Sequence, residues 1–449
     1  MNAGQLNAFS AHFCGFAIWF FSRYVSLAPM RRAENTPAPP WSPRKMTQEA
    51  LLDSRGVNDA ATVVGEIELS VVIPCLNEVD TLGSCLAKAF RSMRDAGIRG
   101  EVIVADNGSA DGSIDIARAA GAQLVSIPKK GYGHALMGGI AAARGKYVIM
   151  GDADDSYDFL EIPKILQKLR EGYDLVQGCR LPYGGGQVLP GAMPLLHRWW
   201  GNPMFTFLSR WWFRVPVNDI YSGFRGFTKE LYTRLDQRCT GMEFATEMII
   251  KAALNGFKIA QVPITLHPDG RKAHAPHLNT FRDGWRTLRF YMLYTPRWLF
   301  LVPGALLMLL GIIGYAVALP GLTFNKVTFD AHTLVFSSLF FLAGFQVAQF
   351  AVFTKTFAIR EGLLPPDARL DRWLQLVTLE RGLVLSLIAL LAGLSLLALA
   401  INRWRLVDFG ALDYAETMRL VVPGATLTTL AIQTFFSSFV ISLLTLGRR

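Results

Sequence analysis

Long apolar runs fill the last third of the chain and distinguish it from the rest. Four runs with almost no charged side chains span residues 298–319, 334–353, 382–401 and 420–446. At about 1.5 Å per residue, each run is long enough as a helix to cross about 30 Å of hydrocarbon. We therefore expect a transmembrane domain with four helices over residues 298–449.

Shorter apolar runs alternate with helical patterns between residues 66 and 275. Strand-like runs lie at 68–73, 101–106, 123–127, 146–150 and 256–264, and helical patterns fit 81–93, 113–120 and 135–143. Strands that alternate with helices indicate a parallel sheet with crossover helices. In such α/β sheets, ligands bind beyond the carboxyl ends of the strands.

Two further segments have an amphipathic or aromatic pattern. In residues 279–294, arginines recur at helical spacing among apolar side chains, so an amphipathic helix on the membrane surface is expected within 276–297. The segment 195–213 holds four tryptophans and two arginines. We interpret it as the approach of a lipid substrate, with an ordinary helix that covers the sheet as the alternative.

The N-terminal extension, residues 1–65, contains an interrupted apolar run and a proline-rich stretch. We expect it to be partly disordered or a weak membrane anchor, and Met46 is an alternative start to Met1. Composition agrees with a membrane protein: 51% of the 449 residues are hydrophobic, and the formal charge of +10 suits anionic membrane surfaces better than nucleic acid. The five cysteines form no paired motif, which indicates reduced thiols in a cytosolic domain.

Basic residues in the connections between the apolar runs predict the orientation. The connection after the second run is the richest, with Lys355, Arg360, Arg369, Arg372 and Arg381. The first connection holds only a lysine, whereas three arginines in the third weaken the contrast without reversing it. Because basic connections stay on the cytosolic side, we expect the α/β domain to face the cytosol.

An acidic cluster ends the apolar run 146–150. Asp152, Asp154 and Asp155 fall within four positions at the predicted end of a strand. Carboxylates at a sheet edge are hard oxygen ligands for Mg2+ or Mn2+, and such an ion can hold a diphosphate. The alternative is a solvated acidic loop.

Six short motifs occur in a fixed order along the α/β region. They are SVVIPCLNE (70–78), VADNGSAD (104–111), KGYGHA (130–135), GDAD (151–154), GCR (178–180) and DIYSGFR (219–225). As a set they resemble the inverting family 2 glycosyltransferases, in particular the dolichol-phosphate mannose or glucose synthases and their polyprenyl-phosphate relatives. The resemblance implies a GT-A (Rossmann-like) catalytic domain over residues 66–275.

The resemblance also implies how a nucleotide-sugar donor is bound. The residues implied are Pro74, Asn77 and Glu78 at the nucleotide, Asp106 at the base, Lys130 and Arg271 near the diphosphate, and Glu247 at the sugar. Many relatives have a second aspartate where this chain has Asn107. This difference leaves the identity of the nucleotide base open. Helix capping by Glu78 or Glu247 and a plain surface loop for Lys130 or Arg271 remain alternatives.

The expected chemistry needs no general base. An ion on Asp152 and Asp154 would stabilise the departing nucleoside diphosphate, and a lipid phosphate is already an anion at neutral pH. The resemblance assigns the acceptor phosphate to Arg180 and Arg225, with Asp219 orienting an arginine.

The expected function is transfer of one hexose, with inversion, from a donor of the GDP-mannose or UDP-glucose type to polyprenyl or dolichyl phosphate. The enzyme would be a multi-pass protein of the plasma (inner) membrane with its catalytic domain on the cytosolic side, and a homo-oligomer is one option for its assembly. A processive polysaccharide synthase is one alternative, although residues 294–298 (YTPRW) lack the glutamine of its usual Gln-x-x-Arg-Trp motif. A glycolipid carrier whose soluble domain only binds is another.

Overall fold

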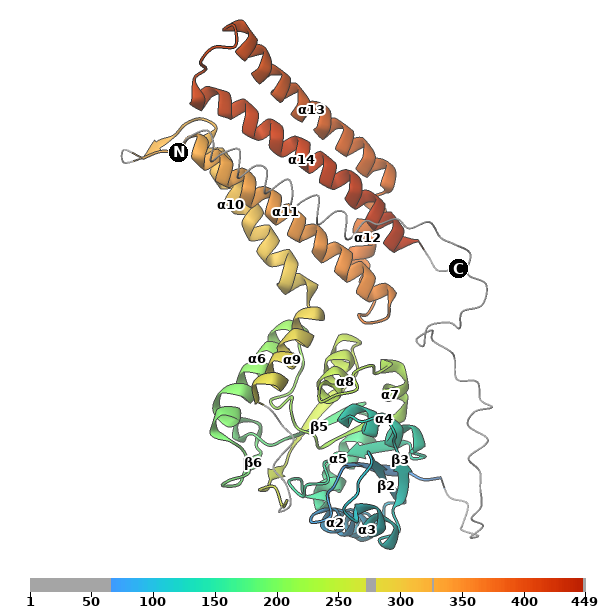
Figure 1. The fold of residues 1–449 in the computed structure, drawn as a ribbon. Coiled ribbons are helices and arrows are strands. Elements are labelled where there is room, and N and C mark those ends of the chain that lie inside the picture. The colour runs from blue at the N-terminus through green and yellow to red at the C-terminus, as the bar shows by residue number, and fades with distance from the viewer. Residues whose placement is uncertain (1–65, 272–279, 325–326, 447–449) are drawn as a thin grey trace. The chain divides into compact units, whose positions relative to one another are not determined.

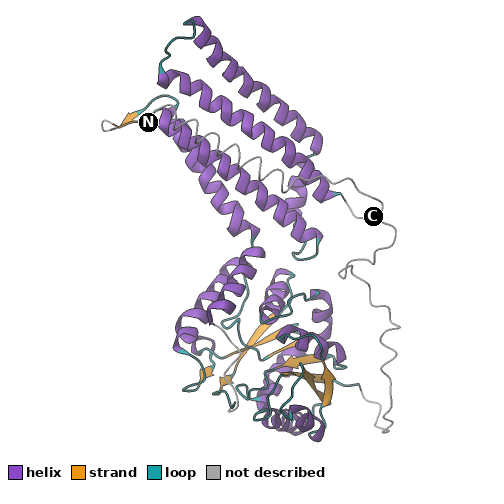
Figure 2. Cartoon of the chain, viewed as in Figure 1, coloured by secondary structure: helices purple, strands orange, loops and turns teal. Residues whose placement is uncertain are grey.

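The computed structural model describes residues 66–271, 280–324 and 327–446 (Figure 1). The expectations for the N-terminal extension 1–65 lie outside the described residues, as do those for residues 272–279. The described chain comprises an α/β domain and a set of long helices, drawn by secondary structure in Figure 2.

A seven-stranded sheet with the order β3-β2-β1-β4-β7-β5-β8 forms the α/β domain. The strands are β1 (Leu69–Cys75), β2 (Gly100–Asp106), β3 (Gln123–Ser126), β4 (Tyr147–Met150), β5 (Leu175–Cys179), β7 (Arg225–Thr228) and β8 (Ile259–Pro263). Neighbours are parallel except β7, which runs antiparallel to β4 and β5. The predicted, mostly parallel sheet is confirmed. Strands β5 and β7 were not predicted, and the residues of β7, Arg-Gly-Phe-Thr, form no apolar run.

Helices cover both faces of the sheet. They are α2 (Leu82–Asp95), α3 (Ser113–Ala119), α4 (Tyr132–Ala142), α5 (Ile162–Arg170), α6 (Asn202–Phe213), α7 (Lys229–Leu235) and α8 (Glu243–Leu254). Alternate residues of β1 enter two cores: Val71 packs in the core that includes α2 and α5, and Val72 in the core that includes α4 and α8. Burial on both faces explains why the central strands are continuous apolar runs.

The predicted helices agree with the observed ones, apart from the start of α4. This helix begins at Tyr132, three residues before the predicted start at 135. The chain turns at Gly131, whose φ of 136° is a conformation that favours glycine. Two short strands, β6 (Gln187–Val188) and β9 (Thr265–Leu266), pair in parallel as a separate sheet.

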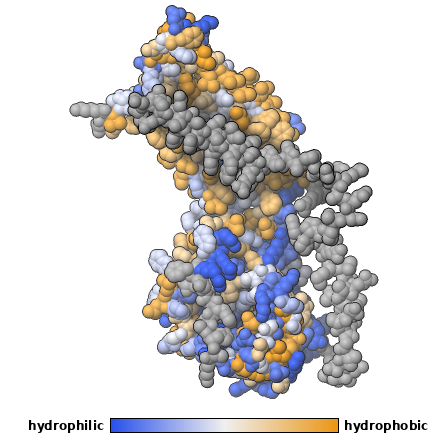
Figure 3. All heavy atoms as spheres, in the orientation of Figure 1, coloured by the Kyte–Doolittle hydropathy of each residue, from blue (hydrophilic) through white to orange (hydrophobic). Residues whose placement is uncertain are grey.

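Four long apolar helices follow helix α9 (Thr280–Leu293). They are α10 (Val302–Ala318), which continues a π-turn at Arg297–Leu301, and α11 (Ala331–Arg360), α13 (Leu379–Leu406) and α14 (Tyr414–Thr445). They confirm the four predicted spans, and Figure 3 shows apolar side chains gathered along them. In their most apolar windows only 11–17% of residues are buried, as helices that face lipid require. A short helix, α12 (Ala368–Leu376), was not predicted.

Small residues bring the long helices close together. A Cβ added to Gly344 of α11 would lie 2.6 Å from the carbonyl oxygen of Gly304 in α10. Likewise, a Cβ on Gly393 of α13 would lie 2.9 Å from the carbonyl oxygen of Gly424 in α14. Close backbone approach at glycine is how membrane helices associate without a hydrophobic driving force. The long helices are therefore arranged as two tightly packed hairpins, α10–α11 and α13–α14.

Candidate active site

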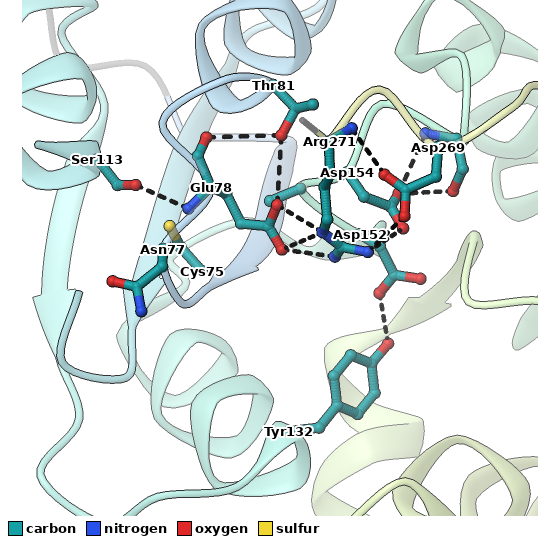
Figure 4. A network of polar contacts seen from close by, with 12 residues as sticks. Cys75, Asn77, Glu78, Thr81, Ser113, Tyr132, Asp152, Asp154, Asp269 and Arg271 are labelled. Atoms are coloured by element: carbon teal, nitrogen blue, oxygen red, sulfur yellow. Dashed lines mark hydrogen bonds and ion pairs between the residues drawn. The ribbon is translucent and has the colours of Figure 1, made fainter. Parts of the chain in front are cut away.

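Two carboxylates face a common space directly after β4 (Figure 4). Oδ1 of Asp152 accepts a hydrogen bond from the hydroxyl of Tyr132 at 2.9 Å. Oδ1 of Asp154 accepts from the backbone and hydroxyl of Ser156, which leaves Oδ2 directed at Arg271. Burial, followed by the charge of Asp154, raises the pKa of Asp152 to about 6. The site therefore disfavours two negative charges unless a cation balances them.

The third carboxylate of the acidic cluster points elsewhere. Asp155 has a φ of 59°, and this turn sends its side chain to Lys88 at 2.8 Å and to the hydroxyl of Ser84 at 2.9 Å, both on α2. Asp155 thus forms an ion pair with α2 and lies apart from the candidate metal ligands. Asp152 and Asp154 remain as the candidate metal ligands.

Arg271 is the cation that meets this acidic site in the structure. Its guanidinium bonds both oxygens of Glu78, at 2.9 and 2.8 Å, and lies 3.3 Å from Oδ2 of Asp154 and 2.8 Å from Asp269. Burial disfavours the charged form of Arg271, but the carboxylates more than offset it and raise its pKa above the ordinary value. The carboxylate of Glu78 therefore does not cap a helix. It binds Arg271, which lies in the segment after β9.

Arg180 and Asp219 form a buried, two-pronged ion pair. Nε and Nη2 of Arg180 donate to the two carboxylate oxygens of Asp219 at 2.7 and 2.8 Å, and Asp219 is 0% exposed. These two hydrogen bonds fix the orientation of the Arg180 guanidinium. Nη1 of Arg180 also reaches the hydroxyl of Tyr157 at 3.4 Å, and that hydroxyl accepts from the backbone N–H of Gly223 at 2.8 Å.

Arg225 lies in a different environment from the one expected for a phosphate ligand. It is 0% exposed, and its guanidinium donates to the carbonyl oxygens of Ala245 and of Ser222, the latter at 2.7 Å. Burial lowers its pKa to about 10. Arg225 lies in β7, between β4 and β5, where its side chain is enclosed. Its hydrogen bond to Ala245 links β7 to α8.

The residues implied at the nucleotide shape the loops after β1 and β2. Pro74 lies in β1, paired with Ala105, and Asn77 adopts a φ of 57° while its side-chain oxygen accepts from the backbone of Ala110. Both carboxylate oxygens of Asp106 accept backbone N–H groups of the turn that follows, at 2.9 to 3.2 Å. Asp111 accepts from the backbone N–H and hydroxyl of Ser113, the first residue of α3.

Asn107 joins β2 to the turn before α4. Its side-chain NH2 donates to the carbonyl oxygens of Ile127 and Lys129, at 3.0 and 2.7 Å, and its oxygen accepts from the N–H of Gly131 at 2.7 Å. An aspartate could not supply the two donors. Lys130, in the same turn, is exposed, with Nζ 3.5 Å from the carbonyl oxygen of Gly108.

Glu247 is enclosed within the fold. It is 0% exposed, pairs with Lys251 at 2.7 Å, and accepts the backbone N–H groups of Arg238 and Cys239 at 3.0 and 2.8 Å. These contacts hold the loop between α7 and α8. A sugar-binding role for Glu247 stays a prediction, whereas its contacts in the structure are those of a loop anchor.

A cavity of about 520 Å3 lies beside α6. It is lined by Tyr183, Pro203, Thr206, Phe207, Arg210 and Trp211. Burial, followed by the charge of Asp219, raises the pKa of Tyr183 to about 12. The tryptophan-rich segment therefore lines part of this cavity, and its Trp199 and Trp200 are about 70% exposed.

The donor set suits a magnesium or manganese ion that is completed by substrate. Among the described residues no group of three or more His, Cys, Asp or Glu side chains could hold a metal. Mg2+ is commonly held by one or two carboxylates together with substrate phosphates and water. Asp152 and Asp154 fit such an ion, and the phosphates of a nucleotide would supply the remaining ligands.

Sequence reasoning missed three residues of the site. Tyr132 lies within the KGYGHA motif without a predicted role, and no role was predicted for Tyr157 or Asp269. For Tyr132, the available signal was its position between two glycines of that motif.

Two family models match the chain. The glycosyl transferase family 2 model matches residues 70–235, and a model described as the C-terminal transmembrane region of glycosyltransferase family 2 matches residues 352–445. Four apolar helices together with the second match show a membrane protein.

Similar proteins point to the same family. The low-salt glycan biosynthesis hexosyltransferase Agl6 of Haloferax volcanii is 36% identical over 375 residues, which cover 83% of this chain and 88% of that protein. The dolichyl-phosphate hexose transferase of the same organism is 34% identical over 218 residues, 48% of this chain and 89% of that protein.

Among solved structures, glucosyl-3-phosphoglycerate synthase from Mycobacterium tuberculosis, crystallised with Mn2+, uridine-diphosphate and phosphoglyceric acid, is 26% identical. It covers 50% of this chain and 78% of that chain, with a TM-score of 0.41. The ordered motifs, the mostly parallel sheet with carboxylates after β4, and the long match to Agl6 agree. This chain therefore belongs to glycosyltransferase family 2 and is a membrane-bound glycosyltransferase.

Proposed function

We propose that the enzyme transfers a single hexose from a nucleotide sugar to a polyprenyl or dolichyl phosphate, with inversion and with a divalent cation. The acidic pair Asp152 and Asp154 beside a buried Arg180 carries the proposal. The name of the Haloferax volcanii dolichyl-phosphate hexose transferase supports the hexose and the lipid phosphate.

Each substrate would meet groups that match its charge. A divalent ion on Asp152 and Asp154 would supply Lewis-acid stabilisation of the departing diphosphate. Arg271 already lies against Asp154 and Glu78, so a small movement of its side chain would bring it to a bound diphosphate. Glu78, relieved of the arginine, would then accept hydrogen bonds from ribose hydroxyls.

The acceptor phosphate would meet Arg180. An arginine has five N–H donors, and the described contacts of Arg180 with Asp219 and Tyr157 use three of them. Asp219 keeps the guanidinium charged and oriented, so the remaining N–H groups suit a phosphate oxygen. The cavity lined by Tyr183, Arg210 and Trp211 gives a prenol chain an apolar approach from α6.

The basic connection between α11 and α13 and the cytosolic supply of nucleotide sugars support a catalytic domain on the cytosolic side of the plasma (inner) membrane. Helix α9, whose arginines recur at helical spacing, would lie along that surface. A homo-oligomer is compatible with this arrangement.

Transfer can be measured with the purified full-length protein, undecaprenyl phosphate, and radiolabelled GDP-mannose or UDP-glucose. We expect one sugar per lipid, abolished by EDTA and restored by Mg2+ or Mn2+. Asp154→Asn should lower turnover by at least about 100-fold. A long polymer would instead indicate a processive synthase, absence of transfer a carrier, and undiminished turnover in Asp154→Asn would refute the metal assignment.

A further inference from the structure

The carboxylate of Asp152 is bracketed from two sides. The hydroxyl of Tyr132 donates to Oδ1 at 2.9 Å, from the first residue of α4 (Figure 4). On the other side a Cβ added to Gly223 would lie 2.6 Å from Oδ2, so only glycine leaves room for this oxygen. One oxygen is thus anchored by a hydrogen bond, and the second occupies space that a side chain at position 223 would otherwise fill.

Tyr132 is itself held by its neighbours. The flanking Gly131 and Gly133 lie so close to the loop before α8 that a Cβ on either would lie 2.6 or 2.7 Å from the carbonyl oxygen of Cys239 or Thr240. The N–H of Gly131 also donates to Asn107 at 2.7 Å. The loop cannot yield easily, because the buried carboxylate of Glu247 binds its N–H groups.

Three layers of contacts therefore lead to one candidate metal ligand. Glu247 holds the loop, the loop and Asn107 hold the start of α4, and the first residue of α4 holds Asp152. Each of these contacts is specific: the carboxylate of Glu247 accepts backbone N–H groups, the two glycines lie beneath carbonyl oxygens, and the hydroxyl of Tyr132 donates to a carboxylate. A ligand kept in one orientation loses less conformational freedom when it binds an ion.

We propose that Tyr132 is a positioning residue: its hydroxyl holds Asp152 so that Oδ2 is presented to the divalent cation. The inference rests on the metal-dependent function proposed above. Removing a hydrogen-bond partner of a metal ligand typically weakens metal binding by about 10–100-fold. Tyr132 would not touch a substrate, and its effect would act through Asp152.

The test measures metal binding rather than turnover. Mn2+ is titrated into the full-length protein in detergent, both alone and with UDP or GDP against a blank that holds only the nucleotide, and free Mn2+ is followed by electron paramagnetic resonance. We expect Tyr132→Phe to raise the Kd for Mn2+ by about 10–100-fold. Tyr291→Phe is the matched control, because it removes another tyrosine hydroxyl, one that bonds to Ser209, without contact to Asp152. Its Kd should equal that of the unaltered protein.

A second substitution approaches Asp152 from the opposite side. Gly223→Ala should displace Oδ2 and weaken Mn2+ binding as well, so the proposal does not depend on one variant. Melting temperatures in EDTA should be similar for Tyr132→Phe and Tyr291→Phe. An unchanged Kd in Tyr132→Phe, or an equal loss in Tyr291→Phe, would overturn the positioning role. Absence of Mn2+ binding to the unaltered protein, even with UDP or GDP added, would instead overturn the metal-dependent function itself.

Discussion

At the scale of single residues, the ionised carboxylate of Asp152 is unfavourable in the folded protein unless a positive charge balances it. Its pKa of about 6 in the folded protein, raised first by burial and then by Asp154, exceeds its ordinary value of 3.8. The folded state therefore binds more protons than the unfolded state between these values, and stability falls as pH rises through them. Above pH 6 the ionised group destabilises the metal-free fold.

Asp152→Asn should consequently stabilise the metal-free protein while it removes a metal ligand. The amide oxygen still accepts from Tyr132, and no charge has to be buried. We expect the free energy of unfolding to rise by about 1–3 kcal/mol at pH 7.5 in EDTA, and the gain to vanish near pH 4. Melting curves at the two pH values, with Mn2+ as a further condition, measure this. A lower melting temperature for Asp152→Asn at pH 7.5 would contradict the expectation.

The Arg180–Asp219 pair should be costly to break. Asp219→Ala leaves a buried guanidinium without its counter-charge, which typically costs about 3–5 kcal/mol. Glu230→Ala is the matched control: its pair with Arg234, at 3.4 Å, is exposed and should contribute little. Thermal unfolding of the two variants checks this. Similar losses of stability in both would show that burial does not make the Arg180–Asp219 pair more costly to break.

At the scale of elements, the start of α4 is set by what packs against it. Glycine lowers helix propensity, so two glycines beside Tyr132 require a reason outside the helix itself. The reason is the loop before α8, whose carbonyl oxygens take the space that side chains at Gly131 and Gly133 would occupy. Strand β7 is a similar case: tertiary pairing between β4 and β5 makes a strand from residues with weak local preference.

Gly133→Ala tests this packing. A Cβ there would lie 2.6 Å from the carbonyl oxygen of Cys239, so we expect a loss of about 1–3 kcal/mol despite the better helix propensity of alanine. Gly83→Ala, in α2, is the control, because its Cβ would meet only Ile116 at 3.7 Å. The melting temperature of Gly83→Ala should stay unchanged or rise slightly, and a rise in Gly133→Ala would exclude the close packing.

At the scale of the whole molecule, two hairpins of membrane helices follow the catalytic domain. The helices extend beyond the apolar runs into charged residues. Arg360 is the last residue of α11, and Arg403 and Arg405 lie in the last turn of α13. Basic residues thus occur at several helix ends, but the connection that includes α12 remains the richest in them. This distribution of basic residues predicts which side of the membrane each connection faces.

Cysteine labelling tests the orientation. We expect an impermeant maleimide to label Leu322→Cys, between α10 and α11, in right-side-out vesicles, and Leu363→Cys, between α11 and α12, only in inside-out vesicles. Of the described native cysteines, Cys75, Cys85 and Cys179 are buried and Cys239 is partly so, which keeps background labelling low. The reverse pattern would place the catalytic domain outside and contradict the use of a cytosolic donor.

By itself, the sequence determined the two parts of the chain and the location of the acidic pair. Spans and strands were predictable because length and apolar periodicity are local properties, and Asp152 and Asp154 follow a strand whose end must lie at the ligand edge. The ordered motifs placed the chain in its family. These properties can be read without knowing which elements pack against one another.

Only the tertiary structure decided which way the long side chains point. Arg271 meets Glu78, which is 193 residues away in sequence, Arg225 turns to backbone carbonyl groups, and Glu247 is buried under a loop. A motif fixes which groups are available, but partners distant in sequence are chosen by packing, burial and charge balance in three dimensions. For that reason the role of Tyr132 became visible only when α4, β4 and the loop before α8 were brought together.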